Sequence, residues 1–117
     1  LNPVAISDGE LNPSELNLET ADLLATAAPW GQQFPEPLFD GRFVIQNKTV
    51  MKERHIKYSL MSSAGGAVVD GIVFGVTPAE WPEIGETIHI AYTLNRHRFR
   101  GIDSLQLMIQ AEVEEDD

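Results

Sequence analysis

The chain has 117 residues, no cysteine and a formal net charge of −10, and 43% of its residues are hydrophobic. That length suits one domain with a real core. The absence of cysteine excludes disulfides and thiolate metal sites. We expect a cytoplasmic domain held together by its core, as is usual inside cells. No apolar run approaches the roughly 20 residues of a membrane span, and no signal segment opens the chain.

Positive charge is confined to the middle of the chain. All eight Lys and Arg residues lie between Arg42 and Arg100, where five acidic residues leave a balance of +3. The acidic total argues against a nucleic-acid partner, because phosphates repel an acidic surface. The uneven distribution nevertheless leaves a mildly basic body between acidic ends. We expect the acidic ending, residues 112–117, to be a solvated tail.

Residues 1–37 read as a junction rather than as part of the main domain. The chain begins at Leu1 and not at methionine, so we expect it to be a piece of a longer protein. Asn17 can cap a helix over residues 18–28, which Pro29 would end. Such a short helix must pack on something to persist. Segment 29–37 contains three prolines and predicts an irregular loop, which Trp30 and Phe34 would anchor to the domain.

From Leu38 onward the hydrophobic period is two. Apolar and polar residues alternate over 55–60, 88–94 and 105–111, which is typical of half-buried antiparallel strands. Two further strands are predicted at 39–50 and 67–74, and Tyr58 is expected to lie in the core. Between the third and fourth strands, residues 77–80 (Thr-Pro-Ala-Glu) have a capping-box pattern that predicts a short helix.

This order of elements predicts a mainly β fold, a five-stranded OB-type barrel with an N-terminal linker helix and a short helix between strands 3 and 4. A five-stranded barrel or sandwich of another topology is the alternative. The predicted organisation is a junction segment at 1–37, an OB-type domain at 38–113 and an acidic tail at 114–117.

We predict no catalytic residue and no metal site in this chain. A metal site needs three or four converging ligands, and no two of the three histidines are spaced as i, i+3 or i, i+4; they are His55, His89 and His97. Exposed strand or loop histidines are expected instead. Asp8 and Glu10 could in principle hold a divalent cation, but nothing nearby completes the set, so a turn is favoured.

Two basic clusters carry the positive signal. The first joins the first two predicted strands, and the second joins the last two. In an OB barrel these two connections flank the groove that binds oligonucleotides. Arginine and lysine would contact phosphates and Phe99 would stack on a base. The predicted nucleic-acid-binding residues are Lys52, Arg54, Lys57, Arg96, Arg98, Phe99 and Arg100. The alternative is that Arg98 and Arg100 pair with Asp103 on their own hairpin and Phe99 caps the barrel.

Four segments of the chain match a known family in order. They are Ser7-Asp8-Gly9-Glu10-Leu11, the loop from Pro29-Trp30-Gly31 to Phe34-Pro35-Glu36-Pro37-Leu38-Phe39, Asp70-Gly71-Ile72-Val73-Phe74, and Phe99-Arg100-Gly101 followed by Ser104-Leu105-Gln106-Leu107. On these residues the chain resembles the C-terminal part of bacterial RecJ proteins, the 5′→3′ exonucleases specific for single-stranded DNA.

The resemblance implies a role in DNA recombination and repair. It implies manganese or magnesium in an upstream domain of the same polypeptide, whose DHH-type motif is absent here, and no cofactor in this segment. The OB domain would hold single-stranded DNA for that upstream catalytic core. The alternative is an interaction module that braces the catalytic core or binds the acidic tail of a single-strand-binding protein.

Overall fold

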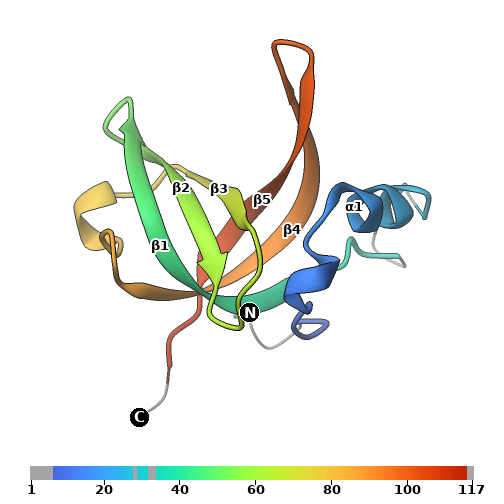
Figure 1. Cartoon of the computed structure of the whole chain (residues 1–117), viewed down its shortest axis with the longest axis horizontal. Helices are drawn as coiled ribbons and strands as arrows, with labels where there is room; N and C mark the ends of the chain where they lie inside the picture. Colours follow the sequence, from blue (N-terminus) through green and yellow to red (C-terminus); the bar gives the residue numbers. More distant parts are fainter. Residues whose placement is uncertain (1–6, 28, 32–33, 116–117) are drawn as a thin grey trace.

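The body of the molecule is a closed barrel of five strands (Figure 1), seen in a computed structural model that describes residues 7–27, 29–31 and 34–115. The strand order around the barrel is β1-β2-β3-β5-β4, and β4 pairs back onto β1. β3 and β5 run parallel, whereas the other neighbours are antiparallel. The predicted OB-type barrel is confirmed. Its strands are β1 (Phe39–Met51), β2 (His55–Ser62), β3 (Val68–Phe74), β4 (Thr87–Phe99) and β5 (Ile102–Glu112).

Strand β2 shows how the alternating pattern builds the core. Ile56, Tyr58 and Leu60 are fully buried, as predicted. The Tyr58 hydroxyl donates a hydrogen bond to the backbone oxygen of Pro82 at 2.8 Å, so its one polar atom is satisfied inside the barrel. The interior is also narrow: a Cβ on Gly71 of β3 would lie 2.8 Å from Leu60 Cδ1. Any larger residue there would make the buried Leu60 and Ile109 side chains shift.

The predicted alternation is wrong at two positions. Ala91 of β4 is fully buried, although the pattern placed it on the outer face. A register shift in the β4–β5 pairing lies between Ala91 and Tyr92, and such a shift locally breaks the two-residue period. Gln106 of β5 is also buried although the pattern placed it on the outer face, and it lines the groove described below.

Helix α1 (Leu18–Ala25) begins as predicted but ends early. Asn17 Oδ1 accepts a hydrogen bond from the backbone N–H of Thr20 at 2.9 Å, which is the expected N-cap. The helix stops at Ala25, and the predicted end at Ala28 lies outside the described residues. The Thr26 hydroxyl donates to the Leu23 carbonyl at 2.6 Å and so satisfies one of the last carbonyl groups. Figure 1 shows α1 beside β4.

The connection between β3 and β4 contains a 3-10 turn, η3 (Pro78–Glu80), without the predicted capping box. The Thr77 side chain makes no capping hydrogen bond. Instead the Glu80 N–H donates to the Thr77 carbonyl at 3.0 Å, because a turn of this length closes on the backbone itself. Lys48 of β1 fixes the connection by donating to the carbonyls of Pro78 at 2.8 Å and Trp81 at 2.9 Å.

The N-terminal segment also differs from expectation in part. A second 3-10 turn, η2 (Pro13–Glu15), precedes α1. Trp30 is half-buried beside α1, as expected of an anchor. Phe34 is 71% exposed, so its predicted anchoring role is wrong. Its carbonyl accepts a hydrogen bond from Gly31 N–H at 2.8 Å, so the backbone is held while the ring faces solvent. Within the described ranges, no helix is long and apolar enough to cross a membrane.

Candidate nucleic-acid interface

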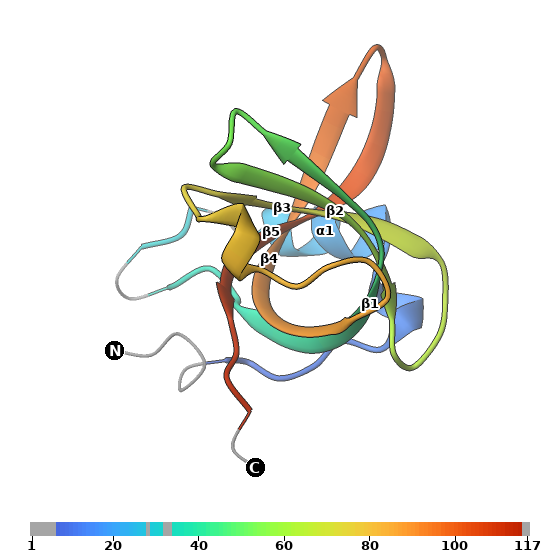
Figure 2. The same cartoon turned by 90° about the vertical axis from the view of Figure 1, so that its left-hand side faces the viewer.

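Two hairpins rise from the same side of the barrel (Figure 1 and Figure 2). One joins β1 to β2 through residues 52–54, and the other joins β4 to β5 through Arg100 and Gly101. The two basic clusters of the sequence lie on these hairpins. The arrangement therefore brings together segments that are more than 40 residues apart in sequence, as the OB prediction required.

Both hairpin tips have left-handed backbone. Arg100 and Gly101 have φ of 51° and 78°, and Lys52 and Glu53 have φ of 51° and 60°. Such turns match the right-handed twist of the flanking strands. The left-handed conformation costs roughly 1–2 kcal/mol for a residue with a Cβ, so strand pairing must hold it. Phe99 belongs to the last residue pair of β4 and β5 before the turn. This pairing fixes the backbone position from which the Phe99 side chain projects.

A groove of about 470 Å³ lies between the hairpins, over the outer faces of β2, β3 and β5. Apolar and polar side chains share its surface. The apolar lining is Met51, Ile72, Phe99 and Ile102, and the polar lining is Lys57, Asp70, His97, Ser104 and Gln106. Two of the seven predicted binding residues, Lys57 and Phe99, line it directly. A nucleobase could enter such a groove, since apolar walls with a few polar groups are typical of ligand sites.

Phe99 is available for stacking. It is 61% exposed, which contradicts the alternative that it caps the barrel. The Arg100 guanidinium carbon lies 5.0 Å from the centroid of the Phe99 ring, a cation–π distance. The contact leaves an exposed aromatic face beside a positive charge, which is the combination that single-stranded nucleic acid requires.

The cations at the hairpin tips have few internal partners. Lys52, Arg54 and Arg100 make no ion pair with any residue that the structure describes. Arg98 Nε lies 3.6 Å from Asp103 Oδ1, beyond hydrogen-bond distance, and its side chain is 70% exposed. The alternative, pairing with Asp103, is therefore loose for Arg98 and not formed for Arg100.

Arg96 has a different environment. Its guanidinium donates to both carboxylate oxygens of Asp22, at 3.0 and 2.7 Å, and to Asp103 at 2.5 Å. The hydrogen bond from Arg96 lowers the pKa of Asp22, and the two carboxylates raise the pKa of Arg96. Since Asp22 belongs to α1, Arg96 ties the β4–β5 hairpin to the N-terminal helix. The contact between Arg96 and DNA stays a prediction. The positive charge of Arg96 is already paired with the carboxylates of Asp22 and Asp103.

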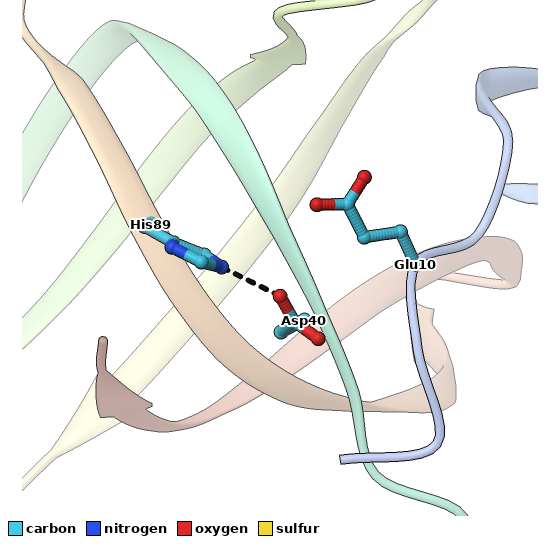
Figure 3. Close-up of side chains that lie close together, drawn as sticks. All are labelled: Glu10, Asp40 and His89. Carbon is cyan, nitrogen blue, oxygen red and sulfur yellow. Dashed lines mark hydrogen bonds and ion pairs between the residues drawn. The ribbon is translucent and has the colours of Figure 1, made fainter. Parts of the chain in front are cut away.

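Sequence reasoning missed a polar network on the other side of the barrel (Figure 3). His89 was expected to be exposed, but its side chain is only 11% exposed. Its Nε2 lies 2.6 Å from Asp40 Oδ2, the contact that is dashed in Figure 3. Its Nδ1 lies 2.7 Å from Glu115 Oε1. A carboxylate only accepts, so both contacts are hydrogen bonds only when both ring nitrogens carry a proton. The network joins β1, β4 and the end of the chain.

Further contacts complete this network. Arg42 donates to both oxygens of Glu115 at 2.8 Å, and Ser7 donates to Asp40 at 2.5 Å. Burial raises the pKa of Asp40, but the hydrogen bonds from Ser7 and His89 outweigh it and leave the pKa below its ordinary value. The hydrogen bond from Arg42, and then that from His89, lowers the pKa of Glu115. The carboxylates therefore stay ionised and hold Ser7 and Glu115 to the barrel.

One group in this region has the residue types of a metal site. Ligand atoms of Glu10, Asp40 and His89 lie within 4.8 Å of one another. Figure 3 shows the Glu10 carboxylate approaching from the N-terminal segment. The mutual hydrogen bonds of His89 and Asp40 account for the arrangement without a cation, because a metal would have to displace them. Glu10, Asp40 and His89 are far apart in the sequence, so no sequence motif predicted that they converge.

The closed strand order, the parallel β3–β5 pair and the groove between two hairpins define an OB-type domain. The family model described as RecJ OB domain matches residues 7–111. The chain therefore belongs to the RecJ OB domain family, and the resemblance seen in the sequence is confirmed.

Curated relatives agree with this family. The single-stranded-DNA-specific exonuclease RecJ of Escherichia coli (strain K12) is 47% identical over 105 residues, which cover 89% of this chain and 18% of that protein. The protein of the same name from Haemophilus influenzae is 40% identical over 112 residues, which cover 93% of this chain and 20% of that protein. The chain thus spans about a fifth of the length of the relatives that it matches.

Solved structures share the fold. The crystal structures of RecJ from Thermus thermophilus in complex with Mn²⁺ and with Mg²⁺ superpose with TM-scores of 0.72 and 0.71. Each match has 20% sequence identity and covers 93% of this chain and 16% of the other. At this identity the likeness speaks for the fold.

Proposed function

We propose that this chain is the single-stranded-DNA-binding domain of a RecJ-type 5′→3′ exonuclease in DNA recombination and repair, and that it holds substrate for a catalytic core elsewhere in the same polypeptide. One observation carries the proposal. An apolar groove with an exposed Phe99 lies between two hairpins, whose cations Lys52, Arg54 and Arg100 have no ion-pair partner among the described residues.

The geometry suits a single strand and not a duplex. Phosphates can contact the cations at the hairpin tips while unstacked bases lie in the groove against Phe99. In a duplex the base faces are already stacked and paired, so the aromatic surface would have no partner. Selectivity for single strands then follows from the need for free base faces.

Catalysis and its metal belong, in this proposal, to the remainder of the polypeptide. The Thermus thermophilus structures contain Mn²⁺ or Mg²⁺, and residues 1–37 here would connect the metal-bearing part to the OB-type domain at 38–113. A solvated acidic tail was expected, but Glu115 is held to the barrel by Arg42 and His89.

The test is a fluorescence titration of the chain with labelled single-stranded DNA over a range of salt concentrations. Three or four phosphate contacts would give a slope of log affinity against log salt of roughly −2 to −3. A duplex of the same length is the control and should bind more weakly at every salt concentration. Equal binding of both forms, or binding without salt dependence, would contradict the proposal.

A second candidate function is an interaction module that braces the catalytic core. Leu23 and Phe34 favour it, because they are 66% and 71% exposed on the junction segment rather than on the groove. A Leu23→Ser/Phe34→Ser double variant should leave DNA binding by the chain intact and weaken exonuclease activity of the whole protein. An acidic peptide with the sequence of a single-strand-binding protein's tail should compete with DNA only if it uses the hairpin cations.

A further inference from the structure

The floor of the groove carries two polar groups that phosphate recognition does not explain. Asp70 of β3 and Gln106 of β5 are register partners in the parallel pair, and both line the groove. Gln106 is only 7% exposed as a residue, but its side-chain amide lines the groove and is not among the fully buried, unpartnered atoms of the described residues. An amide that reaches the groove can hydrogen-bond a ligand there, because it both donates and accepts.

Asp70 makes the floor unsuitable for phosphate. Its carboxylate lies 3.7 Å from the ammonium group of Lys57, the other charged residue of the groove. The pair leaves the floor without net charge, and a phosphate there would face a carboxylate. The unpaired cations lie at the hairpin tips instead. The sugar–phosphate backbone should therefore follow the tips, with its bases turned down onto the floor.

We propose that this floor is a nucleobase subsite that favours bases with an exocyclic amino group, read by Asp70 and Gln106. The inference rests on the proposed function and specifies how the same groove meets its ligand. Asp70 accepts a hydrogen bond from the amino group, and the Gln106 amide donates to the adjacent ring nitrogen or carbonyl. Phe99 and Ile72 line the same groove, where the bases of neighbouring nucleotides would pack against them.

The chemistry distinguishes cytosine from uracil most cleanly. The two bases have the same ring size, and they differ at position 4, where cytosine has an amino donor and uracil a carbonyl acceptor. Acidic side chains accept from the cytosine amino group in protein–DNA complexes. Uracil would place its carbonyl oxygen against the Asp70 carboxylate, and two acceptors repel each other. Gln106 can serve either base, because its amide both donates and accepts.

The experiment compares oligo-dC with oligo-dU of one length on the full 117-residue chain at fixed pH and salt. One hydrogen bond predicts about 2- to 10-fold tighter binding of oligo-dC. Asp70→Asn should bring the affinity ratio close to one, since an amide can donate to the uracil carbonyl. Gln106→Met should weaken both oligonucleotides and leave part of the preference.

Glu53→Gln is the matched control, because Glu53 is an exposed acid in the β1–β2 tip and does not line the groove. It removes the same charge as Asp70→Asn and should strengthen both oligonucleotides equally, with the ratio unchanged. Equal binding of oligo-dC and oligo-dU by the parent chain, or a ratio that Asp70→Asn leaves intact, would overturn the inference while the proposed function stands. Failure to bind either oligonucleotide would overturn both.

Discussion

The two sides of the barrel use positive charge in opposite ways. On the network side, Arg42 and His89 each lie within hydrogen-bond distance of carboxylates from other segments. On the groove side, Lys52 and Arg54 have no ion-pair partner among the described residues. Charges that the fold neutralises act as structure, and charges that it leaves open are available to a ligand. The comparison shows why the total of −10 is a poor guide to partners.

The largest expected effect is the loss of DNA affinity when the cations at the hairpin tips are removed. A Lys52→Ala/Arg54→Ala/Arg100→Ala variant removes up to three phosphate contacts of about 0.7 slope units each, so the salt slope should flatten by about 2. Affinity for single-stranded DNA near 0.1 M salt should then fall by about 100-fold. Arg42→Ala is the control, and titrations of both variants should show a loss only for the first. A similar loss for both would mean that overall charge decides binding.

Stacking should have the next largest effect. Phe99→Ala should cost about 1–3 kcal/mol of binding free energy, because a base loses its aromatic partner. The salt slope should not change, since no charge is removed. Phe34→Ala removes a ring that is even more exposed than Phe99 and lies away from the groove, and it should leave binding unchanged. If the Phe99 variant binds as tightly as the parent, the ring is not a stacking surface.

On the network side, the expected change is in stability. His89→Leu leaves the largely buried Asp40 carboxylate without its ring N–H partner, which should cost about 1–3 kcal/mol of unfolding free energy. Denaturant unfolding measures this cost, and the DNA titration should be unaltered. If His89→Leu is as stable as the parent, the network does not stabilise the fold. If the variant stays folded but no longer binds DNA, the network side also takes part in binding.

Acid should weaken the network side. The pKa values of Asp40 and Glu115 lie below their ordinary values in the fold. Their stabilisation is therefore present above the ordinary carboxyl pKa of about 4 and is lost as pH falls through the lower folded values. Unfolding midpoints from about pH 7 to about pH 3 should fall more steeply for the parent than for Asp40→Asn. Parallel curves would show that Asp40 contributes nothing to this dependence.

The smallest effect separates two arginines of one hairpin. Arg96 already pairs with Asp22 and Asp103, whereas Arg98 only approaches Asp103. Arg98→Ala should therefore flatten the salt slope by nearly one contact, about 0.7, and Arg96→Ala by less. Lysine at either position preserves the charge and serves as the control. The reverse order would show that Arg96 exchanges its carboxylates for phosphate.

The sequence predicted the strands well because side-chain period is a local property. The buried set Ile56, Tyr58 and Leu60 follows directly from the two-residue alternation in β2. Ala91 was missed because a register shift depends on pairing with another strand. The capping pattern at residues 77–80 was present, but the Thr77 side chain makes no capping hydrogen bond in the fold.

The candidate site was predictable only in outline. The OB topology predicted that the two basic clusters lie on one side of the barrel. Their positions in the β1–β2 and β4–β5 connections were enough for that inference. The pairing of Arg96 with Asp22 joins residues 74 apart, and that of His89 with Asp40 joins residues 49 apart. Neither pair has a sequence signature, because the docking of α1 and the closure of β1 onto β4 decide them. Which basic residues are neutralised could therefore be learned only from the structure.

The closure of the barrel also bears on how the chain folds. The β1–β2 and β4–β5 hairpins are local in sequence, whereas the β1–β4 and β3–β5 pairings that close the ring are not. Non-local pairing is slow, because loop-closure entropy is spent before contacts form. The two walls of the groove can thus form separately and meet only at the last step. A strand of DNA that touches both hairpins binds the closed state alone, so bound DNA should slow the opening of the ring and raise the melting temperature.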